Sequence, residues 1–321
     1  KPGRGSAKWQ KGLQFNGRDF TLDGSVQLEI ERPLEEERIE RLQAYGERLV
    51  IELSEPVKLD GSDTGSSSRT ARRVAVYPAE QPNKDGTIPP VRVYHQQRTT
   101  ADELLAQEVV WATGVELEPK KNTFRIAGPG SLWTMRQESG DAVPVATPMA
   151  TADGLTFLKV QFQRSMEGQW SAGQVRLFGP VSALYGKAAD WQVMDQESLL
   201  LQPLRITSDT MTINRWQASA HAPTELEWEA DGRVHVLGEE FEGTAQRINF
   251  AQSQDLLTMR GDGRAPAKFW QTTATSQERN HLAADKIWYR PKQEDFHFEG
   301  FQEGNLNFFS GRRGGLSSAG K

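Results

Sequence analysis

The sequence predicts an all-β protein of repeated antiparallel hairpins that curl into an elongated jelly roll or an open, folded-over sheet. Two observations predict it: apolar and polar residues alternate over many short segments, and one hairpin-like unit recurs along the chain. Composition agrees, because hydrophobic residues make up 36% and charged residues 25% of the 321 residues. This polar balance suits an elongated sheet with much surface per residue.

Strand-type alternation is clearest in Leu22–Ile30, where every second position is apolar or glycine. The same period of two occurs in Val175–Val181 and in Trp111–Leu117. Because successive side chains of a strand point to opposite faces, each segment would have one apolar face.

The segment from Glu35 to Leu53 contains two competing signals. Its first part is rich in Glu, Arg and Leu, so a short helix over Glu35–Arg41 is possible by propensity. Leu49, Ile51 and Leu53 alternate, and Pro56 closes the run. We therefore expect Leu42–Leu53 to be mostly strand.

The recurring unit is strongest at two places near the C-terminus. Gln246–Phe250 and Asp285–Tyr289 share the order polar, basic, Ile, any residue, aromatic, and each reaches a glycine 15 positions after its start, Gly261 or Gly300. Between these anchors, a polar turn precedes an apolar pair, so each unit reads as a β-hairpin. Weaker copies begin at Asp209, Glu47 and Glu108, the last with a longer turn around Pro119–Asn122.

A two-stranded ribbon is marginal in water, so the hairpins are expected to pair along their edges. Glycines at the strand ends would permit the kinks that fold a sheet over. The alternating apolar residues of the repeats would then face a common interior.

The repeat resembles the organic-solvent-tolerance (OstA-like, LptA-like) family of lipopolysaccharide-transport jelly rolls. The likeness rests on a strand of pattern small, any, polar, basic, Ile, any, aromatic, followed by a polar turn and a return strand that ends in glycine. It is best over Thr244–Gly300, fair over Leu22–Leu53 and Leu104–Gly128, and weak over Leu155–Ile213. Long Gly/Ser-rich and Pro-rich insertions make the chain a divergent and enlarged relative.

The resemblance implies an elongated β-jelly-roll or β-taco fold. It also implies a non-enzymatic protein, periplasmic or associated with the outer membrane, that binds a lipid or bridges lipopolysaccharide transport. Acyl chains of an amphipathic lipid such as lipopolysaccharide would lie in an apolar groove, at about 0.8 kcal/mol per buried methylene. Other envelope jelly rolls would be partners through edge-strand pairing. The candidates for lining the groove are Val110, Phe124, Ile126, Ile248, Phe250, Leu257, Met259, Ile287, Tyr289, Phe296 and Phe298.

Loop-rich stretches suggest the organisation of the chain. We expect a flexible segment over 1–12, a first jelly-roll-like part over 13–138 with long loops at 60–70 and 80–90, and a linker over 139–154. A second such part would cover 155–309, and a flexible tail 310–321. The chain starts at Lys1, so we expect a processed or excised piece without any signal peptide.

Several kinds of chemistry are not indicated. The chain has no cysteine, its net charge is −5 without a basic stripe, and its five histidines lack ligand spacing. Nucleotide-binding loops and nucleophile elbows are missing too. We therefore expect no catalytic residue, metal, cofactor, nucleic-acid partner or transmembrane segment.

Two alternatives remain from the sequence alone. The first is a structural or adhesive β-repeat module with a dry core and no ligand. The second is an enzyme such as a β-sandwich glycosidase, which would need two carboxylates about 5–10 Å apart.

Overall fold

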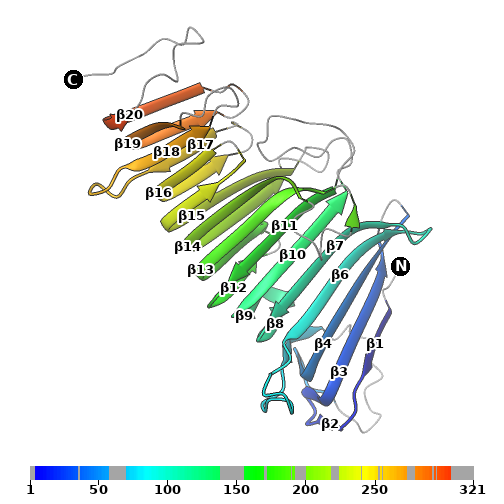
Figure 1. The fold of residues 1–321 in the computed structure, drawn as a ribbon. Helices are drawn as coiled ribbons and strands as arrows, with labels where there is room; N and C mark the ends of the chain where they lie inside the picture. Colours follow the sequence, from blue (N-terminus) through cyan, green and yellow to red (C-terminus); the bar gives the residue numbers. More distant parts are fainter. Residues whose placement is uncertain are drawn as a thin grey trace.

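The described residues of the computed structural model form mainly β-strands, with a short 3-10 turn at Pro119–Lys121, and they contain no α-helix (Figure 1). The chain is described over residues 4–34, 37–57, 70–137, 155–169, 172–188, 190–191, 200–217, 224–239, 241–251, 254, 256–272, 279–290, 293 and 295–304.

The strands follow one another along the molecule, with the two ends of the chain at opposite ends (Figure 1). The first half contains β1 (Arg4–Lys8), β2 (Gly12–Phe15), β3 (Asp19–Pro33), β4 (Arg38–Leu53), β5 (Ala71–Tyr77), β6 (Val91–Thr99), β7 (Leu104–Ala112), β8 (Gly114–Glu118), the turn η1 (Pro119–Lys121), β9 (Thr123–Ala127) and β10 (Gly130–Gln137). The second half contains β11 (Leu155–Phe162), β12 (Ser165–Gln169), β13 (Gln174–Ala188), β14 (Leu201–Gln217), β15 (Thr224–Leu237), β16 (Phe241–Ala251), β17 (Leu256–Arg260), β18 (Ala267–Thr272), β19 (Arg279–Arg290) and β20 (Asp295–Gly304).

The long strands pair with different neighbours at their two ends. β4 pairs with β6 through residues 38–45 and with β5 through residues 48–53. β16 pairs in the same way with β18 and with β17. The sheet is therefore folded over along one line, which we call the crease. Wall A is the half that contains β6, β7, β10, β11 and β18, and wall B is the half that contains β5, β8, β9, β12 and β17.

Glycine-containing bulges bend the strands at the crease. Between β15 and β16 the register shifts, so that Gly232 and Arg233 lie opposite the single residue Gln246. Gly232 has a φ of 81°, in the left-handed region that favours glycine. Two residues opposite one, with such a glycine first, form a β-bulge that bends the strand. Equivalent bulges lie at Gly24 in β3 and at Gly179 in β13.

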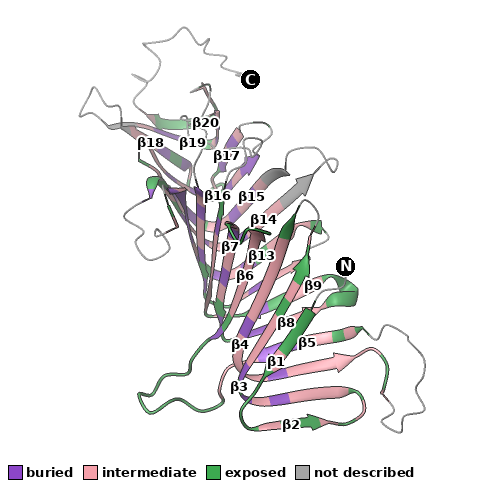
Figure 2. Cartoon of the chain, turned by 90° about the vertical axis from the view of Figure 1, so that its right-hand side faces the viewer, coloured by how far each residue is buried: buried purple, intermediate pink, exposed green. Residues whose placement is uncertain are grey.

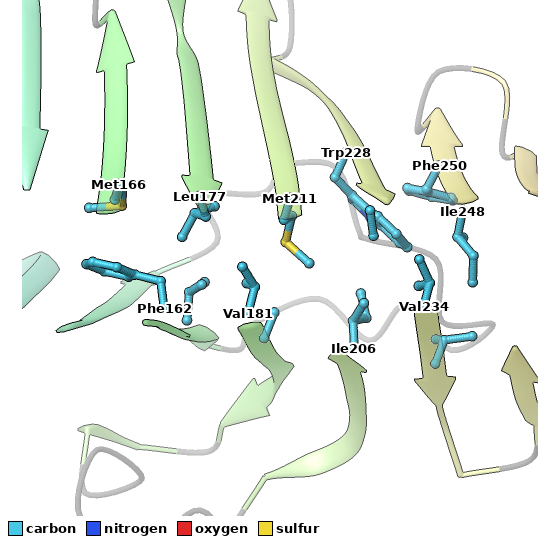
Figure 3. Packing of buried hydrophobic residues seen from close by; sticks show 14 of the residues in the cluster. Phe162, Met166, Leu177, Val181, Ile206, Met211, Trp228, Val234, Ile248 and Phe250 are labelled. Carbon is cyan, nitrogen blue, oxygen red and sulfur yellow. The ribbon is translucent and has the colours of Figure 1, made fainter. Parts of the chain in front are cut away.

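The core lies between the walls, beside the crease. Figure 3 shows Met166, Leu177 and Met211 of wall B opposite Phe162 and Val181 of wall A. Figure 2 shows that buried positions recur from strand to strand. In wall B the row nearest the crease is closed to solvent along nearly the whole molecule, and its members are Leu22, Leu49, Val76, Val115, Ile126, Met166, Leu177, Met211, Ala230, Ile248, Met259 and Ile287.

The outer face of wall B is polar. Arg73 lies 2.8 Å from Glu52 and 2.7 Å from Glu116, and Arg125 lies 3.4 Å from Glu167. Cross-strand pairs of this kind contribute at most about 1 kcal/mol each. Their main consequence is a hydrated outer surface, which leaves the apolar face of this wall turned inward.

The predicted all-β class and the two C-terminal hairpins are confirmed, because β16 pairs with β17 and β19 with β20. Gly300, however, lies within β20 rather than at its end, with a φ of 66°. The possible helix over Glu35–Arg41 is not formed in its described part, since β4 begins at Arg38. The expected strand over Trp111–Leu117 is broken at Thr113, where the chain passes from β7 in wall A to β8 in wall B.

Part of the segment over 1–12, which was expected to be flexible, forms a strand. Arg4–Lys8 form β1, which is held by backbone pairing to β3, and this pairing requires no apolar alternation in the sequence. The loop at 60–70, the linker at 139–154 and the tail at 310–321 lie essentially outside the described residues. β10 and β11 pair directly across the expected linker, so the two predicted parts share one sheet. The division itself stays a prediction.

Candidate functional site: the groove between the walls

In the N-terminal part of the molecule, the inward-facing residues that lie farther from the crease are mostly only half-buried. The second inward-facing row of wall A includes Val93, Val110 and Leu132, which are only half-buried. The facing row of wall B is half-buried as well, and it comprises Phe20, Ile51, Val74, Leu117, Phe124, Val175 and Ile213. Since these side chains share the inner faces with the buried row, solvent reaches them between the walls. We call this space the open groove.

The same row is closed in the C-terminal part. There Trp228, Phe250, Leu257 and Tyr289 of wall B are at most 7% exposed, and Phe269 of wall A is fully buried. The burial of the inward-facing residues therefore differs along the molecule. The interior is accessible to solvent toward the N-terminus and packed toward the C-terminus.

Aromatic rings from both walls meet at the closed end. Phe269 of wall A lies 5.4 Å from Tyr289 and 5.0 Å from Phe296 of wall B, measured between ring centroids. Tyr289 stacks on Phe296 at 4.3 Å, and Phe241 stacks on Phe269 at 5.8 Å. These separations lie in the range of favourable aromatic pairs. We call these four residues the aromatic plug.

All the sequence-predicted groove residues belong to the main hydrophobic cluster between the walls. Val110 and Phe124 line the open groove, whereas Phe296 and Phe298 are half-buried at the C-terminal end. The remaining candidates are at most 7% exposed and form the closed core: Ile126, Ile248, Phe250, Leu257, Met259, Ile287 and Tyr289. Contact of any of them with a ligand stays a prediction.

Other residues of the open groove were not predicted. Val93 and Leu132 of wall A and Ile51, Val74 and Leu117 of wall B occupy it. They lie in alternating segments, which is the signal that could have found them. The strongest copies of the repeat lie at the closed end, so most of the predicted candidates came from there.

Charged side chains form a row on the inner face of wall A, at its rim. From β3 to β10 they are Arg32, Glu40, His95, Glu108 and Arg136, and we call this row the polar ladder. They share a face with the apolar groove residues, because Arg32 follows Leu28 by four positions, His95 follows Val93 by two, and Arg136 follows Leu132 by four.

The centre of the polar ladder is a histidine between two carboxylates. His95 Nε2 lies 2.8 Å from Glu40 Oε1, and His95 Nδ1 lies 3.1 Å from Glu108 Oε2. Hydrogen bonding to Glu108 raises the pKa of His95 above its ordinary value, partial burial opposes this, and Glu40 adds to the rise. Arg32 pairs with Glu40, and Arg136 approaches Glu108 at 3.7 Å.

No group of three or more His, Cys, Asp or Glu side chains that could hold a metal ion is found in the described part of the chain. Within those same residues, no helix is long and apolar enough to span a bilayer.

Comparison with known protein families decides the relationship. Residues 202–295 match the family described as LptA/(LptD N-terminal domain) LPS transport protein. This stretch is similar to that family, and we call it the LptA-like domain. It overlaps most of Thr244–Gly300, where the sequence resemblance is best, and confirms it. A search of curated proteins finds no match to the chain.

The LptA-like domain runs from β14 to the start of β20 and thus includes the closed end of the groove. It gives the chain a role related to lipopolysaccharide transport. The open groove, from β3 to β13, is formed mostly by residues that precede the matched stretch.

Proposed function

We propose that the chain is a non-enzymatic envelope protein that shields the acyl chains of lipopolysaccharide, or of a related amphipathic lipid, in the open groove. The observation that carries the proposal is the half-buried apolar row on both walls, including Val110 and Leu132 opposite Leu117 and Phe124. Each methylene that such a row removes from water contributes about 0.8 kcal/mol. The rim leaves room for a polar headgroup in solvent.

The ends of the molecule support docking of other jelly rolls. β1 runs toward the crease, because Arg4 pairs with Glu31 and Lys8 with Gln27. β20 runs away from the crease through residues 301–304 of wall A. A neighbour placed end to end would therefore continue wall A as an antiparallel sheet, and the directions of β2 and β20 allow the same in wall B.

The charges of these ends are complementary. β1 presents exposed Arg4 and Lys8, whereas β20 presents exposed Glu299 and Glu303. Such charges favour association between an N-terminal and a C-terminal end and disfavour pairing of like ends.

Binding of a fluorescent acyl-lipid analogue, followed by native mass spectrometry for co-purified lipid, tests the proposal. We expect Val110→Asp, which places a carboxylate in the open groove, to abolish binding. Gln107→Asp places the same charge on the outer face of the same strand and should bind normally. Loss of binding in both variants, or in neither, would reject the groove as the site.

The packed interior at the closed end favours a second candidate, a structural module without a ligand. That function requires that the purified protein carries no lipid and takes up none. A wild-type protein that binds no lipid in the experiment above would establish it over the lipid-binding proposal.

A further inference from the structure

The polar ladder is the exception among the inner rows. Nearer the crease, the groove is lined by apolar side chains of both walls, such as Val110 of wall A and Ile51 and Leu117 of wall B. Charged groups facing an apolar space are costly unless they are paired. The rim of wall A is thus charged, whereas the groove beside it is lined by apolar side chains of both walls.

The ladder alternates in sign along five strands. With His95 protonated it carries three positive and two negative charges, a net charge of +1. Each carboxylate lies between His95 and one arginine, so both acids are largely neutralised by their neighbours. The positive excess is located at the two ends of the row.

The two terminal arginines are accessible. The side chain of Arg32 is 58% exposed, and that of Arg136 is 45% exposed. Arg136 lies 3.7 Å from Glu108, beyond hydrogen-bond distance, so its guanidinium keeps donors for another acceptor. A guanidinium can donate two parallel hydrogen bonds to a phosphate.

We propose that the polar ladder is a headgroup subsite that binds the phosphate of a phosphorylated amphipathic lipid through Arg136. This rests on the proposed function, because the lipid's acyl chains would occupy the open groove. A lipid seated there directs its chains toward wall B and its phosphate toward the rim of wall A. Glu40 and Glu108 position the arginines and His95, and protonated His95 supplies the charge that makes the ladder net positive.

Two fluorescent lipids with the same acyl chain test the subsite: a labelled lysophosphatidic acid and the matching monoacylglycerol, both below their micelle concentrations. The measurement is the ratio of their affinities. We expect the wild type to prefer the phosphorylated lipid and Arg136→Gln to lower this preference by about tenfold. Arg32→Gln should lower it much less, because Arg32 lies four strands away from Arg136, about 19 Å at about 4.8 Å per strand. Thermal unfolding verifies that each variant is folded.

The matched control is Arg125→Gln. Arg125 also belongs to a cross-strand pair, with Glu167 at 3.4 Å, but it lies on the outer face of wall B and is 68% exposed. Its loss should leave the affinity ratio unchanged. An Arg125→Gln effect equal to that of Arg136→Gln would overturn the subsite, because it would indicate general charge attraction.

The outcomes separate this inference from the proposed function. If the wild type binds both lipids equally and the arginine variants do not alter the ratio, the subsite is rejected and the groove stands. If the wild type binds neither lipid, the groove itself is rejected and the subsite with it.

Discussion

Phe269 of wall A lies with its ring centroid 5.4 Å from that of Tyr289 of wall B. This contact joins the two walls directly, close to the C-terminal end of the sheet. It divides the interior into an open and a closed part, and it lies inside the LptA-like domain.

Truncation of Phe269 should destabilise the protein strongly. The ring is fully buried, so Phe269→Ala removes apolar contacts with both walls and leaves a cavity. We expect a loss of about 3–5 kcal/mol in the free energy of unfolding, measured by urea denaturation. Phe301→Ala is the control, because Phe301 is 46% exposed. Equal losses in the two variants would contradict the role of the plug.

His95 should contribute stability that depends on pH. Its pKa is raised in the folded protein by Glu108 and Glu40, so the folded state binds its proton more tightly than the unfolded state. The contribution should be complete below the ordinary histidine pKa of about 6.5 and should be lost as the pH rises through the higher folded value. Urea denaturation of wild type and His95→Gln across pH 5–9 tests this. A stability difference that grows with pH would refute it.

Gly232 should resist substitution for steric as well as conformational reasons. A Cβ at this position would lie 2.5 Å from Asp209 Oδ2, and φ is 81°. Gly232→Ala should therefore cost about 1–3 kcal/mol of stability. Gly263 has the same φ, but a Cβ there meets nothing within 4 Å. Gly263→Ala should cost less, and the difference between the two measures the contact at the crease.

Removal of the Ser208 hydroxyl should stabilise the protein. It is 6% exposed in an otherwise apolar row of wall A, and its Oγ has no hydrogen-bond partner. Because a buried hydroxyl without a partner is unfavourable, Ser208→Ala should raise the free energy of unfolding by about 1 kcal/mol. A thermal melt that shows a lower Tm for this variant would indicate a hidden partner.

The strands and their inward faces could be predicted because they depend on local alternation. Ile248 and Ile287 each precede the aromatic residue of their repeat by two positions. Both are fully buried in the row of wall B nearest the crease, as the alternation predicts. The copy of the repeat at Glu47 lies in β4 and contributes Leu49 to the same row.

The open and closed parts of the interior could not be predicted in this way. Val110 and Phe250 have equivalent alternation in the sequence, yet one is half-buried and the other is 3% exposed. The solvent exposure of these two side chains depends on how closely the opposite wall packs against them, and the residues of that wall are distant in sequence. The two carboxylate partners of His95 could not be predicted either. Glu108 and Glu40 lie 13 and 55 positions away in the sequence, and the register of the strands brings them to the histidine.

The crease has a mechanical consequence. Each long strand continues covalently from one wall into the other, so the walls cannot slide or separate as independent layers. A bulky guest can be accommodated only by flexing the backbone at the bulges, with the greatest displacement at the free margins. Because each long strand bends at its own bulge, the distance between the walls can change from one strand to the next. The walls can therefore move apart near the N-terminus while the aromatic plug keeps them in contact near the C-terminus.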